Sequence, residues 1–334
     1  MAGSLPADQL SRPAGGLEPG MNVLVTGATG LVGGAVAKAL WTAGYQVTAL
    51  VRSPRLAAHL PAADTNLVVG DMLRPETYRP LVRHVDAVVH AAQVRIPGRV
   101  TGTALASLDA ADRVATETLA SACAEWGRRL LYTSGCFGYG DHGDSWINEQ
   151  TPLNPSPLGV SHARQVEYLR GRRQAGLDAV ILHLGFVYGP GGNFADVFYD
   201  QARRNRLRCI GKGAGYWSCV HADDVGAAFV AALERAPAGS EYNIVDDTPL
   251  RLREFVDALT DAMARPRVGR LPTWLARLVV GEPAIASLTT SYRVGNEAAR
   301  TELGWVPRFP SVHQGLPQVV TELEQRSLLP LDRA

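Results

Sequence analysis

The chain has 334 residues, and its 33 Lys and Arg residues nearly balance its 32 Asp and Glu residues, which leaves a formal charge of +1. This balance argues against nucleic-acid binding, which needs a basic surface. The length suits a nucleotide-binding domain with a smaller second lobe. The most apolar long segment, residues 271–292, is interrupted by Arg277, Glu282 and Pro283, so we expect no membrane-spanning helix.

The first 20 residues are rich in Ala, Gly, Pro and Leu, but they lack a basic segment followed by a continuous apolar stretch. This composition predicts a disordered leader and not a signal peptide. The four cysteines form no C-x-x-C pair, which is typical of free thiols in a reducing compartment. We therefore expect a cytoplasmic protein.

A glycine-rich turn follows the leader, and residues 22–34 read Asn-Val-Leu-Val-Thr-Gly-Ala-Thr-Gly-Leu-Val-Gly-Gly. A short apolar run predicts a buried strand, and an amphipathic helix follows the glycines. Such a turn lets the backbone approach a pyrophosphate, whose charge is met by free N–H groups at the helix N-terminus. No Lys stands where a P-loop would need one. The predicted cofactor-binding residues of this turn are Gly27, Thr29, Gly30, Leu31, Val32 and Gly33.

The second predicted strand, residues 46–51, ends at Arg52 and Ser53. A carboxylate near this point would bind the ribose 2′-hydroxyl of NAD, whereas an Arg suits the 2′-phosphate of NADP. No acidic residue occurs between positions 47 and 60, so we predict NADP(H) as the cofactor. A third strand, residues 66–70, leads into Asp71 and Met72, which we place beside the adenine.

Strands and helices continue to alternate along the chain. We expect strands at residues 86–90, 129–133 and 179–183, with helices at 104–126 and 160–173. This order predicts an α/β fold with a doubly wound parallel sheet, in which ligands bind at the carboxyl ends of the strands. At that edge we expect cofactor contacts from Ala91, Ala92, Gln93 and Thr133.

The pattern changes after residue 184, where several glycines and Pro190 mark an exit from the sheet. Helices at 195–205 and 252–264 should build a second lobe, while a helix at 225–234 and a strand at 242–245 return to the sheet. We expect His221, Asp223 and Asp224 to cap that returning helix. The predicted organisation is a Rossmann domain over residues 21–190 with 222–248 returning to it, and a smaller C-terminal substrate domain from 191–221 and 249–330.

Several motifs occur in a fixed order: residues 26–33, 70–71, 90–92, 132–134, 186–190 and 220–224. Together they resemble the extended short-chain dehydrogenase/reductase family, the group that contains NAD-dependent sugar epimerases and dehydratases. The resemblance covers about residues 21–320. It implies a Rossmann domain, a substrate pocket between two lobes and further cofactor contacts at Leu184, Gly185, Phe186 and Val187.

The catalytic pattern of that family is missing. The family uses a Ser or Thr after the fifth strand and a Tyr-x-x-x-Lys pair, in which the Tyr transfers a proton and the Lys lowers its pKa. The motifs align these three positions with Gly135, Leu158 and His162. Only two lysines occur in the chain, Lys38 and Lys212, so no realignment of this helix restores the pair.

Other residues could replace the missing groups. We take Ser134, Ser161 and His162 as candidate catalytic residues, and His162 could also contact the nicotinamide ribose. Tyr139 and Tyr188 are further candidates for a recruited group. The sequence 141–144, Asp-His-Gly-Asp, has no second cluster to complete a coordination shell, so we predict a solvated turn and no metal site.

The predicted substrate pocket suits a flat aromatic molecule. The lost triad and the tract 131–140 also resemble atypical family members that act as polyketide ketoreductases. We therefore expect an NADPH-dependent ketoreductase of an angucyclinone-like aromatic polyketide in antibiotic biosynthesis, with the proton supplied by a substrate phenol or by water. The alternatives are a sugar-nucleotide epimerase or dehydratase and a redox-inactive NADP(H) sensor, and the protein would be a monomer or a homodimer. The candidate pocket residues are Val94, Ile96, Gly135, Cys136, Phe137, Tyr188, Phe194 and Trp217.

Overall fold

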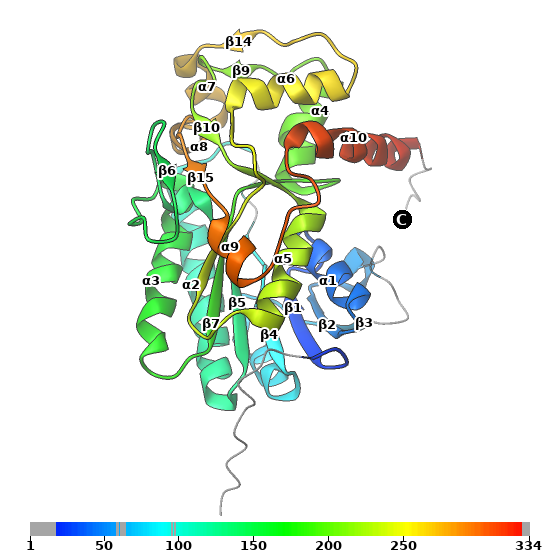
Figure 1. Cartoon of the computed structure of the whole chain (residues 1–334), viewed down its shortest axis with the longest axis vertical. Coiled ribbons are helices and arrows are strands. Elements are labelled where there is room, and N and C mark those ends of the chain that lie inside the picture. The colour runs from blue at the N-terminus through cyan, green and yellow to red at the C-terminus, as the bar shows by residue number, and fades with distance from the viewer. Residues whose placement is uncertain (1–17, 58–59, 61–64, 95, 97, 329–334) are drawn as a thin grey trace, which may run out of the picture.

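The computed structural model describes residues 18–57, 60, 65–94, 96 and 98–328 (Figure 1). Residues 1–17, which make up most of the predicted leader, lie outside the described residues, so that prediction is untested. None of the helices in the described ranges is both long enough and apolar enough to cross a membrane.

A seven-stranded parallel sheet forms the centre of the molecule. Its strand order is β12-β7-β5-β4-β1-β2-β3. The chain fills the sheet outwards from β1 to β3 on one side, and then from β4 to β12 on the other side of β1. The carboxyl ends of β1 and β4 therefore border the crevice in which ligands bind in sheets of this type. The strands are β1 (Asn22–Thr26), β2 (Gln46–Val51), β3 (Thr65–Val69), β4 (Ala87–His90), β5 (Arg129–Gly135), β7 (Ala179–Leu184) and β12 (Glu241–Ile244).

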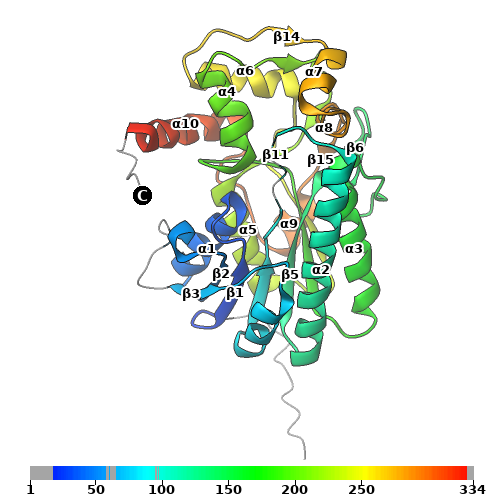
Figure 2. The same cartoon turned by 180° about the vertical axis from the view of Figure 1, so that it is seen from behind.

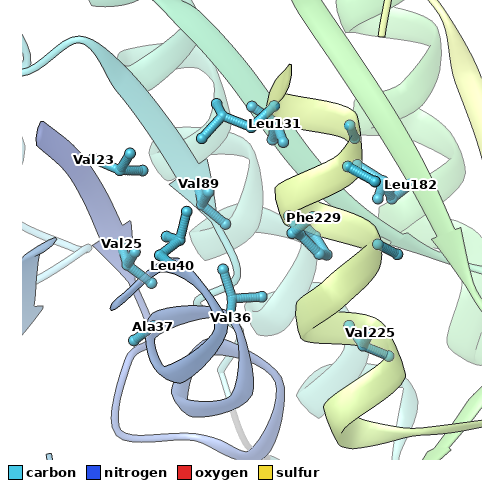
Figure 3. Packing of buried hydrophobic residues seen from close by; sticks show 14 of the residues in the cluster. Val23, Val25, Val36, Ala37, Leu40, Val89, Leu131, Leu182, Val225 and Phe229 are labelled. Carbon is cyan, nitrogen blue, oxygen red and sulfur yellow. The ribbon is translucent and has the colours of Figure 1, made fainter. Parts of the chain in front are cut away.

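Helices cover both faces of this sheet (Figures 1 and 2). On one face lie α1 (Leu31–Thr42) and α5 (Ala222–Arg235), and on the other lie α2 (Gly102–Trp126) and α3 (Val160–Arg173). Side chains alternate along each strand, so Val23 and Val25 of β1 pack towards α1 and α5 while Leu24 packs towards α2. Figure 3 shows Val36 and Leu40 of α1 beside Phe229 of α5 over the first of these faces.

A second lobe lies beyond the carboxyl ends of the strands. Cys136, Tyr188 and Val245, which follow β5, β7 and β12, belong to its separate hydrophobic core. Its helices are α4 (Asp200–Arg203), α6 (Leu252–Ala262), α7 (Thr273–Val280), α8 (Glu282–Leu288) and α10 (Val312–Leu328), and α9 (Glu297–Glu302) packs back near β12. Its short strands pair as β6 (Trp146–Ile147) with β15 (Arg293–Val294), β8 (Phe186–Tyr188) with β11 (Cys219–His221), β9 (Cys209–Ile210) with β14 (Arg270–Leu271), and β10 (Tyr216–Trp217) with β13 (Leu250–Arg251).

The structure confirms the predicted doubly wound α/β fold, and two local expectations need correction. The helix expected at 195–205 begins as a π-helical segment, Phe194–Tyr199, before α4. The returning helix α5 begins at Ala222, where the ring of His221 accepts the N–H of Asp223 at 3.1 Å. Asp224 does not cap α5, because its carboxylate accepts the N–H groups of Arg308 and Phe309 at 2.8 and 3.1 Å. The exact boundaries between the two lobes remain a prediction.

Candidate active site

The ends of β1 and β4 are held tightly together at the crevice. The Thr26 hydroxyl accepts the N–H groups of Ala91 and Ala92 at 3.2 Å each and lies 2.9 Å from Nδ1 of His90. Gly27 has a φ of +73°, and a Cβ there would lie 2.7 Å from the backbone of Ala92. Only glycine therefore fits between these two strand ends.

The glycine turn then opens onto the N-terminus of α1. A Cβ on Gly33 would lie 2.2 Å from the carbonyl oxygen of Gly27, so the third glycine allows the helix to start directly over the turn. Gly30 precedes the helix without a side-chain cap, and the first turn carries no acidic residue. The N–H groups of Leu31 and Val32 belong to this uncapped first turn, where an anion is favoured. These residues fit the diphosphate of a dinucleotide.

The predicted adenosine end of the site lies beside β2 and β3. Arg52 is exposed directly after β2, and Ser53 is half-buried. No ion pair joins Arg52 to any residue within the described ranges. The Asp71 carboxylate accepts the N–H of Leu73 at 2.9 Å, so one of its oxygens holds a local turn. The assignment of Asp71 and Met72 to the adenine remains a prediction.

The three aligned catalytic positions come together at the end of β5. A Cβ built on Gly135 would lie 3.8 Å from Cδ2 of His162, which is the first-turn residue of α3. Leu158 lies in a 3-10 turn, Pro157–Gly159, just before α3, and its N–H donates to Oγ of Ser287 at 2.9 Å. The structure therefore brings Gly135 and His162 close together and places Leu158 just before α3. That these positions match the catalytic residues of the family remains a prediction.

The hydroxyl groups considered as replacements are engaged elsewhere or enclosed. Ser161 donates to Oδ2 of Asp112 at 2.6 Å, and Tyr139 donates to Oδ1 of Asn243 at 2.8 Å. Burial raises the pKa of Tyr139 and of Tyr188 far above the ordinary value, so neither phenol gives up its proton readily. Ser134 is 3% exposed. Their assignment as catalytic groups remains a prediction.

Further along the edge, the Thr133 hydroxyl is buried with no hydrogen-bond partner among the described residues. An unpaired buried hydroxyl is costly, and it fits a site that a polar ligand completes. Leu184 ends β7, Gly185 joins it to β8, and Val187 belongs to β8. The ring of Phe186 lies 4.9 Å from that of Trp217 in the core of the second lobe, so it packs as a core residue.

The candidate substrate residues divide into two groups. Val94 is 44% exposed and Ile96 is half-buried, while Phe137 packs edge-on against Tyr292 with ring centres 5.2 Å apart. These three side chains are at least partly exposed. The others are buried in the core of the second lobe: Cys136, Tyr188, Phe194 and Trp217. The place of all of them in a substrate pocket remains a prediction.

A groove of about 400 Å³ was not predicted from the sequence. It runs between the first turns of α2 and α3, and Leu158 and Ser161 form part of its wall. Pro155 and Pro157 line the groove beside α2. This proline-rich stretch is the feature of the sequence that could have indicated an irregular segment here. The groove reaches the catalytic position from the side.

The family assignment follows from comparison with known proteins. Residues 23–245 match the NAD dependent epimerase/dehydratase family, and the chain belongs to this family. It is 32% identical to a 3-diazoavenalumate denitrifying reductase of a Streptomyces species, covering 89% of this chain and 99% of the relative. It is 28% identical to a 2-alkyl-3-oxoalkanoate reductase of Stenotrophomonas maltophilia, covering 89% and 97% of the two chains.

Solved structures agree with the fold. The dTDP-glucose 4,6-dehydratase DesIV of Streptomyces venezuelae, with NAD bound, superimposes with a TM-score of 0.78 at 24% identity, covering 91% of this chain and 97% of DesIV. The human epimerase family protein SDR39U1, with NADPH, gives a TM-score of 0.74 at 20% identity, covering 91% and 100%. One of these two structures contains NAD and the other contains NADPH. The family, together with its reductase relatives, indicates an enzyme that uses NAD or NADP.

Proposed function

We propose that the protein is an NADPH-dependent ketoreductase that reduces a carbonyl of an angucyclinone-like aromatic polyketide in antibiotic biosynthesis. One observation carries the proposal: the glycine turn before the uncapped start of α1 suits a diphosphate, whereas the motifs align Leu158 and His162 with the proton donor and the lysine of the family. Such a site favours a substrate that accepts hydride without help from a tyrosine. Arg52 supports NADP(H) over NAD.

The chemistry divides between cofactor, protein and substrate. The bound cofactor supplies a hydride to the carbonyl carbon. The glycine turn and the sheet edge bind and orient the dinucleotide, and the apolar wall at Val94, Ile96 and Phe137 receives a flat ring. The carbonyl oxygen takes its proton from a neighbouring substrate phenol or from water, and solvent then restores the phenol. The missing tyrosine would otherwise supply roughly 10²–10⁴ in rate.

The printed names of the relatives support a reductase. Besides the two reductases above, the chain is 27% identical to a 4-hydroxy-2-methyl-3-oxo-4-farnesyl-3,4-dihydroquinoline-1-oxide ketoreductase of Stigmatella aurantiaca, covering 89% of this chain. An epimerase or dehydratase reaction is less favoured, because Leu158 offers no group to move a proton. A redox-inactive sensor would need a dinucleotide-binding site, but it would not need exposed apolar side chains to bind a substrate.

A second candidate is reductive denitrification of a diazo compound, because the Streptomyces relative has that name. In this reaction hydride adds at the diazo-bearing carbon, the carbon–nitrogen bond breaks, and N₂ leaves. From a diazonium form no proton donor is required. The absence of the tyrosine therefore suits this reaction as well as it suits ketone reduction.

The test is oxidation of NADPH and of NADH by the purified protein with hydroxyquinone polyketides, an aryl diazonium compound and sugar nucleotides. The proposal expects NADPH turnover on the phenolic ketones. Loss of turnover when the neighbouring hydroxyl is methylated would identify the phenol as the proton donor, and retained turnover would identify water. Deuterium from [4-²H]NADPH should appear at the carbinol carbon. Turnover only on the diazonium compound, with release of N₂, would replace the proposal by the second candidate, and binding of NADPH with no turnover would support the sensor.

A further inference from the structure

Helix α7 of the second lobe presents large apolar side chains to solvent. Trp274, Leu278 and Val279 are 65%, 62% and 65% exposed, and Leu275 is 36% exposed. Within α7, which the structure describes completely, only Ala276 is buried. The helix is therefore reversed relative to an ordinary surface helix, which turns its large apolar side chains towards the core. We call the four exposed side chains the outer face of α7.

The outer face of α7 is one continuous arc. Positions 274 and 278 are about one helical turn apart, as are 275 and 279, and consecutive positions differ by about 100° around the axis. A contiguous exposed apolar surface of this kind marks an interaction site. The indole N–H of Trp274 is the one hydrogen-bonding group among these four side chains.

Basic residues surround the start of α7. Residues 200–212 and 257–282 contain nine Lys and Arg residues and four Asp and Glu residues, although the whole chain has a charge of only +1. Four of the basic side chains are exposed and form no ion pair within the ranges that the structure describes: Arg206, Arg208, Lys212 and Arg270. This end of the molecule is therefore basic, while the remainder of the chain is net acidic.

The two basic stretches lie side by side. Strand β9 pairs with β14 in parallel, with Cys209 opposite Arg270. The N–H of Gly211 donates to the carbonyl of Leu271 at 2.9 Å, and a Cβ on Gly211 would lie 2.9 Å from Oγ1 of Thr273, the first residue of α7. Figures 1 and 2 show β9, β14 and α7 at the end of the second lobe farthest from the sheet. The basic residues therefore flank α7 at an outer end of the molecule.

We propose that the outer face of α7 and the basic residues beside it dock on the surface of an anionic phospholipid membrane. Tryptophan and aliphatic side chains enter the boundary between headgroups and acyl chains, and neighbouring Arg and Lys residues attract anionic headgroups. This inference goes beyond the proposed function and does not depend on it.

The same observations favour lipid over a protein partner. A second copy of the chain would bring an identical basic surface against this one, and like charges repel across an interface. A different protein would need directional contacts, since interfaces of standard size have about ten hydrogen bonds, and the outer face of α7 offers one donor. A lipid surface needs only apolar burial and negative charge.

The test is vesicle sedimentation with the purified full-length chain, without cofactor or substrate. We expect binding to vesicles of phosphatidylglycerol and phosphatidylcholine in equal amounts, and binding at least about tenfold weaker to vesicles of phosphatidylcholine alone. Binding to the mixed vesicles should weaken as the NaCl concentration rises, because salt screens the attraction.

Substitutions on the outer face of α7 test the apolar contact. Leu278→Gln should weaken binding to the mixed vesicles about fivefold or more, because it removes one aliphatic side chain from the bilayer boundary. Val306→Gln is the matched control, since Val306 is 60% exposed outside this surface, and it should leave binding unchanged. Brominated phosphatidylcholine should quench the fluorescence of Trp274, so the quenching should be lost in Trp274→Phe and kept in Trp146→Phe, which removes an exposed tryptophan of β6.

Substitutions of the basic residues test the charge. Arg208→Gln combined with Arg270→Gln should weaken binding to the mixed vesicles about tenfold and change binding to phosphatidylcholine vesicles little. Arg83→Gln combined with Arg113→Gln is the matched control, because it removes two exposed charges from the sheet domain. It should change neither affinity.

Failure to sediment with the mixed vesicles at low salt would overturn the proposal. Binding that Leu278→Gln leaves unchanged, or that occurs without quenching by brominated lipid, would also overturn it, since charge alone would then account for the binding. A dimer in sedimentation velocity that Leu278→Gln dissociates would assign the outer face of α7 to a second copy instead. None of these outcomes depends on whether the protein reduces a ketone.

Discussion

Leu158 limits the chemistry of this site more than any other single residue. The motifs predict that it occupies the position of the family's proton donor, and its side chain can neither donate nor accept a hydrogen bond. His162 beside it is neutral at pH 7, and Ser161 is engaged by Asp112. The side chains at the aligned positions can bind and orient, and the proposed reaction therefore draws its proton from the substrate or from water.

Arg52 gives a test of cofactor choice at the residue scale. Arg52 is exposed directly after β2, where we predict the 2′-phosphate of NADP to bind, so Arg52→Ala should raise the KM for NADPH about tenfold and leave that for NADH unchanged. Steady-state kinetics with both cofactors measures this. Arg55→Ala is the matched control, since Arg55 is also exposed three residues further on, and an equal effect of both substitutions would contradict the assignment.

The motifs align Gly135, Leu158 and His162 with the catalytic positions of the family, and the structure brings Gly135 and His162 into contact distance. That these residues take part in the reaction remains a prediction. The contacts of Tyr132 with His162 and of Asp112 with Ser161 were not predicted, because they join residues 30 and 49 positions apart in the chain and depend on how α2 and α3 pack on the sheet. Trp217 and Phe194 are buried, and their place in a substrate pocket remains a prediction, since an apolar side chain near a site suits a pocket and a core equally well.

At the scale of elements, β12 is tied to α3 by a charged cluster at the edge of the sheet. The Glu241 carboxylate accepts hydrogen bonds from Nε and Nη2 of Arg170 and from Nη2 of Arg173, each at 2.8 Å. It also lies 2.9 Å from Nε2 of His183. Burial acts to raise the pKa of Glu241, but the hydrogen bonds from His183 and Arg170 outweigh it and hold the pKa far below the ordinary value. The carboxylate is thus more stable ionised in the folded protein than in the unfolded chain.

This cluster makes the free energy of unfolding depend on pH in the acidic range. Because the folded pKa is depressed, its contribution is complete above the ordinary carboxyl pKa of about 4.3, begins to fall below it, and is lost fully only as the pH falls through the depressed folded pKa. Glu241→Gln should therefore lower the free energy of unfolding at pH 7 by about 3 kcal/mol and by less at pH 3, where part of this contribution is already lost. Urea unfolding at both pH values measures the difference.

Glu167→Gln is the control for this prediction, since Glu167 contacts the same Arg170 from an exposed position. It should change stability by less than about 0.5 kcal/mol. Equal effects of the two substitutions, or an effect of Glu241→Gln that does not depend on pH, would contradict the role of the cluster.

Most elements were predictable, because buried parallel strands and amphipathic helices carry strong periodic patterns. The first two strands and the helices at 160–173 and 252–264 agree with the structure to within a few residues. The predicted cap by His221 is confirmed, but α5 begins at Ala222, three residues earlier than expected, and Asp224 does not join the cap. The π-helical segment before α4 has no signal in residue spacing.

At the scale of the whole molecule, Asp224 ties α5 to the segment that leads from α9 to α10. Its carboxylate accepts two backbone N–H groups of residues 308 and 309, and its carbonyl accepts Nε1 of Trp305 at 3.1 Å. This tie connects the sheet domain to the C-terminal part of the chain, which the sequence alone did not predict.

Asp224→Ala should lower the free energy of unfolding by about 2–4 kcal/mol, because it leaves two largely buried N–H groups without an acceptor. Denaturant unfolding followed by tryptophan fluorescence would show this, since Trp305 is 3% exposed beside the tie. Asp223→Ala is the neighbouring control: its carboxylate pairs with Lys38 at 3.1 Å on the surface and should contribute little. A larger effect at position 223 than at 224 would contradict this account.

The space beside Gly135 has a consequence for how such enzymes diverge. A side-chain carbon there would meet its nearest neighbours, His162 and the carbonyl of Leu184, at 3.8 and 3.9 Å, which is ordinary contact. A serine could therefore enter at this position without rearrangement, in contrast to the turn glycines, which are sterically fixed. The end of β5 therefore has room for a hydroxyl group that the present residue does not supply, and Gly135→Ser would place one beside His162.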